Sequence, residues 1–69
     1  MATFPFGWLR GIEDDNWQIL WDSQTRILYV KGILSKRVID LGQPSTWQEA
    51  KSLADRVRNE PELYIDLSS

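Results

Sequence analysis

One stretch near the end of the chain carries apolar residues at helical spacing, and it limits the folds open to the rest. Its apolar residues recur every three or four positions, with polar and charged residues between them: Trp47, Ala50, Leu53, Ala54 and Val57. This pattern predicts an amphipathic helix with one face packed in a core. Because a single helix cannot bury such a stripe alone, the remaining residues must supply an apolar surface for it.

Signals at both ends set the bounds of this helix. Thr46 is followed three residues later by Glu49, which is the spacing of a capping box. At the other end, Asn59 is suited to a left-handed cap, and Pro61 disfavours helical angles at the residue before it. We therefore expect a helix over residues 46–59.

Two runs rich in aromatic and β-branched residues, 17–22 and 27–31, predict a β-hairpin. A symmetric turn centred on Gln24 and Thr25 pairs Trp21 with Leu28, and side chains then alternate between two faces. One face is apolar and belongs to the core: Trp17, Ile19, Trp21, Leu28 and Val30. The other is mixed, and is either a binding surface or covered by another segment: Gln18, Leu20, Asp22, Ile27, Tyr29 and Lys31.

Three further segments have strand character. Residues 7–12 can pair with the first hairpin strand across a turn at residues 13–16, and residues 37–41 place Ile39 and Leu41 on one face. Residues 62–67 alternate in polarity, with Leu63, Ile65 and Leu67 inward. The strand at residues 37–41, the helix and this last strand would together form a right-handed crossover. The predicted class is α+β: a small curved, mostly antiparallel sheet of four to five strands in the order β-β-β-β-α-β, with one amphipathic helix packed on one face.

Length and composition narrow the class of protein. A chain of 69 residues makes one domain, residues 1–69, with a thin margin of stability. It has no cysteine and no histidine, so disulfides are excluded and a structural zinc site is disfavoured. Stability must come from an aromatic core or from association with a partner. Because no signal-peptide pattern and no apolar run of about 20 residues is present, we expect a soluble, cytoplasmic protein without a transmembrane segment.

The sequence lacks two of the side chains that most often serve in catalysis. The commonest general base, histidine, and the thiol nucleophile are both missing, and so short a chain struggles to enclose a pocket. The run Glu13-Asp14-Asp15 fits a solvated turn better than a cation site, because no spaced Asp/Asn loop with a closing Glu follows it. We expect no enzyme activity, no metal site and no cofactor.

The segment 1–9 is apolar and aromatic, with no charge before Arg10. It either wraps over the mixed face of the hairpin or forms a docking tail for a partner, and aromatic patches are typical of interaction sites. We therefore predict a small non-enzymatic protein-interaction module, an accessory subunit or adaptor of a larger assembly, or a chain that self-associates through the same patch. The partner-binding residues would be Phe4, Phe6, Trp8 and Leu9, with Leu20, Ile27 and Tyr29 beside them.

A second hypothesis comes from a resemblance. Leu41-Gly42 followed by Thr46, Glu49 and Ala50, behind a strand meander, resembles the end of the DNA-binding domains of the AP2 and phage-integrase type. Those domains run three strands and then a packed helix, and they read the major groove with the sheet. The resemblance implies a β-sheet-based nucleic-acid-binding domain, for which Arg26, Lys31 and Arg37 are the available cations. That family lines its sheet with several Arg and Trp side chains, whereas the net charge here is −2, so this function ranks second.

Overall fold

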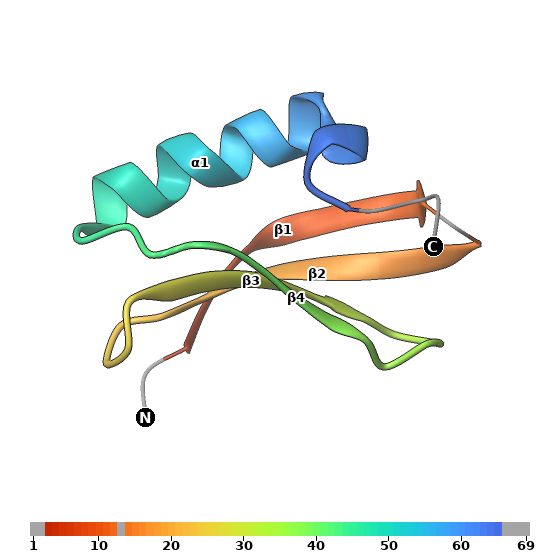
Figure 1. The fold of residues 1–69 in the computed structure, drawn as a ribbon, viewed down its shortest axis with the longest axis horizontal. Coiled ribbons are helices and arrows are strands. Elements are labelled where there is room, and N and C mark those ends of the chain that lie inside the picture. The colour runs from red at the N-terminus through yellow and green to blue at the C-terminus, as the bar shows by residue number, and fades with distance from the viewer. Residues whose placement is uncertain (1–2, 13, 66–69) are drawn as a thin grey trace.

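The computed structural model describes residues 3–12 and 14–65. Four antiparallel strands lie in the order β1-β2-β3-β4, and one helix crosses one face of the sheet (Figure 1). The elements are β1 (Thr3–Ile12), β2 (Asp15–Asp22), β3 (Ile27–Gly32), β4 (Val38–Gly42), α1 (Trp47–Asn59) and a short 3-10 helix, η1 (Pro61–Leu63). This arrangement confirms the α+β class. No helix in this described part of the chain has the length and apolar character needed to cross a membrane.

The register of the central hairpin is the predicted one. Trp21 pairs with Leu28, Leu20 with Tyr29 and Ile19 with Val30. The four-residue turn is closed by Asp22, whose backbone oxygen accepts from the Arg26 N–H at 2.6 Å. The Asp22 carboxylate also accepts from the Gln24 N–H at 2.9 Å, so this side chain holds the turn as well as ending β2.

The N-terminal segment is an edge strand of the sheet. β1 begins at Thr3, four residues earlier than the sequence predicted, and it pairs with β2 rather than wrapping over the mixed face of the hairpin. A bulge separates Pro5 from Gly7, and Gly7 has a φ of 126°, a value that side-chain-bearing residues rarely adopt. At this bulge the Arg58 guanidinium of α1 donates to the Phe6 carbonyl oxygen at 3.4 Å, which joins the helix to the edge of the sheet.

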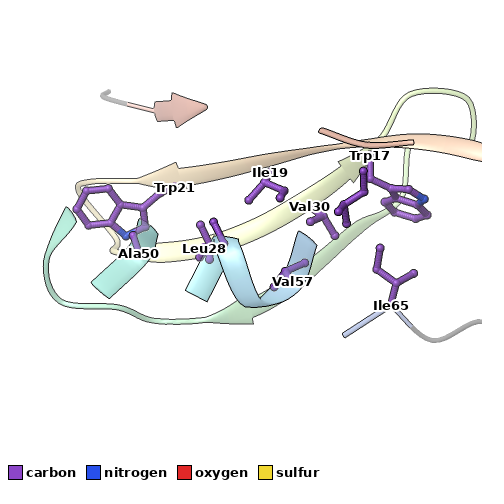
Figure 2. Close-up of a cluster of buried hydrophobic side chains, with 10 residues drawn as sticks. Trp17, Ile19, Trp21, Leu28, Val30, Ala50, Val57 and Ile65 are labelled. Atoms are coloured by element: carbon purple, nitrogen blue, oxygen red, sulfur yellow. The ribbon is translucent and has the colours of Figure 1, made fainter. Parts of the chain in front are cut away.

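The core lies between α1 and the sheet. The fully buried residues come from both layers: Trp17, Ile19, Leu28 and Val30 from the strands, Ala50, Ala54 and Val57 from α1, and Ile65 from beyond η1. Figure 2 shows Trp21 at one end of this cluster and Trp17 with Ile65 at the other. Ile39 and Leu41 of β4 pack against the same cluster, as their alternation predicted.

The helix has the predicted start but a different end, and its stripe is buried only in part: Ala50, Ala54 and Val57 are buried, whereas Trp47 is 42% exposed. The Thr46 hydroxyl accepts from the Glu49 N–H at 3.2 Å, while the Glu49 carboxylate accepts from the Ser45 N–H at 3.0 Å. In a regular capping box the Glu49 carboxylate would accept from the Thr46 N–H, whereas here it accepts from the N–H of the residue before Thr46. Asn59 is not a left-handed cap: it stays helical, and Glu60, with a φ of −136°, ends the helix and donates its N–H to the Arg56 oxygen.

The fifth strand, predicted over residues 62–67, is absent from the described part of that segment. Glu62 and Leu63 lie in η1, and Leu63 is 73% exposed rather than inward. The cause is Pro61, whose fixed φ suits the first position of a helical turn and whose oxygen accepts from the N–H groups of Tyr64 and Ile65 at 3.1 and 2.9 Å. Ile65 is buried as predicted, whereas Leu67 falls outside the described residues.

Candidate interaction surface

The sheet has one face that α1 does not cover, and we call it the outer face. Strand pairing places Trp8 opposite Gln18, Pro5 opposite Leu20 and Lys31 opposite Val38 on this side. Its residues, from β1 to β4, are Thr3, Pro5, Trp8, Arg10, Asn16, Gln18, Leu20, Asp22, Ile27, Tyr29, Lys31, Val38 and Asp40. Among the described residues no segment lies across them, because α1 packs on the opposite side of the sheet (Figure 1).

Apolar side chains occupy much of the outer face. Trp8 is 44% exposed and Val38 is 56% exposed, while Leu20, Ile27 and Tyr29 are half-buried by their neighbours in the sheet. A shallow depression of about 310 Å³ lies at one end, between Trp8, Arg10, Asn16 and Ile33. Exposed rings next to polar groups that can form hydrogen bonds are characteristic of protein-binding surfaces.

Arg10 and Asn16 are members of this surface that sequence reasoning missed. Arg10 follows Trp8 by two residues in β1, so alternation places both on the same face. The Asn16 Oδ1 accepts from the Gly11 N–H at 3.3 Å, which orients the side-chain amide with its NH₂ group as the remaining donor. The signal for Arg10 is the i, i+2 spacing from Trp8 within the strand predicted over residues 7–12, but the mixed face was assigned from the hairpin strands alone.

The seven predicted partner-binding residues do not form one surface. Trp8, Leu20, Ile27 and Tyr29 share the outer face, whereas Leu9 is buried in the core. Phe4 and Phe6 lie on the helix side, with their ring centres 5.7 and 5.6 Å from that of Trp47. Trp47 is 42% exposed, so this aromatic cluster caps one end of the core while remaining open to solvent. The bulge after Pro5 is what separates Phe6 from Trp8.

The three basic residues of the nucleic-acid hypothesis are spread over the molecule. Arg26 lies in the β2–β3 turn and Arg37 in the β3–β4 loop, so the six residues of β3, about 20 Å of strand, separate them. The Arg37 guanidinium stands 5.7 Å from the centre of the Trp17 ring, a cation–π contact with a core residue. Lys31 is the one of the three on the outer face.

The acidic run holds a structural carboxylate. Asp15 is buried, and its carboxylate accepts four hydrogen bonds. The donors are the backbone N–H groups of Asn16, Leu34 and Ser35 and the Ser35 hydroxyl. These hydrogen bonds hold the pKa of Asp15 well below its ordinary value of 3.8, and the bond from the Leu34 N–H has the largest effect. Residues 14–65 and 3–12 contain no group of three or more side chains placed to hold a metal ion.

Gly32 belongs to the same arrangement. A Cβ at this position would lie 2.4 Å from the Ser35 Oγ and 2.6 Å from the Asp15 Oδ2, so only a glycine lets the carboxylate reach the β3–β4 loop. Asp15, Gly32 and Ser35 therefore act together as a cross-sheet tie, and we call them the Asp15 tie. Both carboxylate oxygens of Asp15 already accept hydrogen bonds from the β3–β4 loop, so we assign the tie a structural role. The candidate site is therefore the outer face.

Comparison of the chain with models of protein families, with curated proteins and with solved structures finds no match.

Proposed function

We propose that this chain is a small non-enzymatic protein-interaction module, and that the outer face of its sheet is the docking surface. The observation that carries the proposal is an uncovered sheet face on which Trp8 and Val38 are about half exposed beside three half-buried apolar side chains. Exposed apolar side chains rimmed by polar residues often mark interaction sites. A tryptophan at its edge is the residue type that most often anchors a partner.

The role of an accessory subunit or adaptor fits this surface better than a catalytic role. The titratable group with the clearest shift, Asp15, is committed to the β3–β4 loop, and the depression beside Trp8 is shallow and open. The cysteine-free sequence is consistent with a reducing, cytoplasmic setting. Nucleic-acid binding is disfavoured because Asp22 and Asp40 share the outer face with its two cations.

Two tryptophans of nearly equal exposure provide a matched test. Trp8→Ala removes the ring from the outer face, and Trp47→Ala removes a ring of the same size from the helix side. Affinity capture from the native source, with quantitation of stoichiometry, should show one protein retained by the wild type and by Trp47→Ala but lost by Trp8→Ala. Both variants are checked for folding by circular dichroism.

The opposite pattern would overturn the assignment of the surface. If Trp47→Ala loses the partner and Trp8→Ala keeps it, docking occurs through the aromatic cluster on the helix side. The nucleic-acid alternative is tested by measuring binding to a labelled single-stranded or duplex oligonucleotide. Binding that weakens steeply with added salt would replace the proposal with the nucleic-acid function.

A further inference from the structure

We propose that the outer face binds a second copy of this chain, so that two sheets pack face to face around a two-fold axis. The inference rests on the proposed function, because it names the partner of the same docking surface. It comes from the way charge is distributed over that surface.

The charges of the outer face are segregated along the strand direction. Arg10 and Lys31 lie in the half toward the β1–β2 turn, in the rows of Asn16 and Gln18. Asp22 and Asp40 lie in the half toward the β2–β3 turn, in the rows of Thr3 and Tyr29. The outer face thus has a basic half and an acidic half, with apolar side chains in both.

Such a surface is complementary to itself. A two-fold axis that lies in the interface and runs across the strands turns the second copy end for end, so the basic half of each copy covers the acidic half of the other. Lys31 then faces the row that carries Asp40 of the second copy, and Arg10 faces the row that carries Asp22. Because the axis is two-fold, every such pair occurs twice.

The apolar residues fit the same arrangement. The row of Trp8 comes to lie over the row of Pro5 in the second copy, which gives the exposed indole a flat apolar partner. The row of Ile33, beside the depression, comes to lie over the row of Ile27. Stacked sheets of this kind pack about 10 Å apart, with the inner side chains of both sheets forming the shared core.

The size of the face sets the expected strength. Four strands about 4.8 Å apart and about six residues long, at about 3.3 Å per residue, cover roughly 400 Å² per copy, so the pair buries about 800 Å². That is the size of a weak or transient interface, so we expect a weak dimer with a dissociation constant in the micromolar range. A partner of one sign, such as a nucleic acid, would be attracted by one half and repelled by the other.

Charge reversal at Lys31 and Asp40, which are both exposed, gives a test with an internal rescue. The mass of the full chain is measured by sedimentation equilibrium from about 1 to about 500 µM, a range that brackets a micromolar constant. Asp40→Lys places two lysines across the interface, and Lys31→Glu places two carboxylates there. Each variant alone should dissociate at least about tenfold more readily than the wild type.

Mixing the two variants restores every charge pair. In the mixed dimer one pair is the native Lys31 with Asp40, and the other joins the introduced lysine of one copy to the introduced glutamate of its partner. Association should therefore return to within about threefold of the wild type. Glu62→Lys and Lys51→Glu carry the same kinds of charge change at exposed positions away from the outer face, and they should leave the dimer unchanged.

A wild type that stays monomeric over the whole range overturns the inference. So does a dimer that the two reversals leave unaffected, or a mixture that stays monomeric while the wild type dimerises. If the chain is monomeric but a different protein is captured in a Trp8-dependent way, the proposed function stands with another partner. If neither occurs, the proposed function falls as well.

Discussion

The carboxylate of Asp15 accepts hydrogen bonds from both the backbone N–H and the hydroxyl of Ser35, at 3.0 and 2.7 Å. The two residues are twenty positions apart, and β2 and β3 separate them along the chain. This contact fixes the β3–β4 loop to the start of β2. It therefore fixes the position of the loop that carries Ile33, which lines the depression at one end of the outer face.

Replacing Asp15 by Asn should lower the melting temperature by about 5 °C or more. The amide offers one acceptor oxygen in place of two, so an N–H group of the β3–β4 loop loses its partner in a partly buried position. The control is Asp14→Asn at the neighbouring exposed position, where a φ of 56° is tolerated by Asn. Thermal unfolding should separate the two variants. Equal melting temperatures would show that the tie contributes nothing.

Acid should weaken the fold in part through this same carboxylate. The pKa of Asp15 is lowered in the folded state from an ordinary value of 3.8, so its contribution to stability is complete above that value and is lost as the pH falls below it. Urea unfolding from about pH 6 down to about pH 2 should show a steeper loss of stability for the wild type than for Asp15→Asn. Parallel curves for the two proteins would assign the acid sensitivity to other carboxylates.

Gly32→Ala should destabilise the fold by about 1–3 kcal/mol, the usual cost of forcing atoms into a packed site. The added Cβ meets the Ser35 hydroxyl and the Asp15 carboxylate, and their mutual hydrogen bonds keep both in place. Gly42→Ala is the comparison, because there the Cβ would meet only the end of the flexible Leu53 side chain, at 3.2 Å. We expect it to cost less than about 1 kcal/mol in the same denaturant titration. A larger loss at Gly42 would contradict this account of Gly32.

The segment after α1 can be tested with two apolar truncations. Leu63→Ala should change the free energy of unfolding by no more than about 0.5 kcal/mol, since its side chain is mostly in solvent. Ile65→Ala should cost about 2–5 kcal/mol, because Ile65 is fully buried in the core. Comparable costs for both residues would favour the alternating strand that the sequence indicated over the turn at Pro61.

The parts of the fold that could be read from the sequence are those in which pattern and local signals agree. In the central hairpin, alternation and a symmetric turn specify the same register, so Leu20, Ile27 and Tyr29 were correctly placed together. In α1, the apolar stripe and the Thr46 cap specify the same start. Each signal alone is ambiguous, but two that agree leave few alternatives.

The N-terminal strand shows why the rest could not be read. Phe4, Phe6 and Trp8 are spaced by two, so a regular strand would place all three rings on one side. The bulge after Pro5 adds one residue, and Trp8 turns to the outer face while Phe4 and Phe6 stay against Trp47. The sequence indicates a disturbance through Pro5 and Gly7, but it does not say which residue is the extra one.

Other features depended on contacts between distant residues. Asp15 looked like one member of a solvated acidic turn, and nothing local shows that its partners are Leu34 and Ser35. After α1, a short alternation of Leu63 and Ile65 competed with Pro61, and the fixed backbone angle of the proline prevailed. The charge halves of the outer face likewise require the register of all four strands.

Within the part of the chain that the structure describes, the strands of this sheet pair with strands next to them in the sequence, from β1 through to β4. Contacts in such a meander join residues that are close in sequence, so little loop entropy is lost before each pairing is gained. The sheet can therefore form by successive hairpins, on the fast side of the range for β-rich domains. Because α1 follows all four strands along the chain, the apolar side of a nascent sheet stays uncovered until residues 47–59 have emerged from the ribosome.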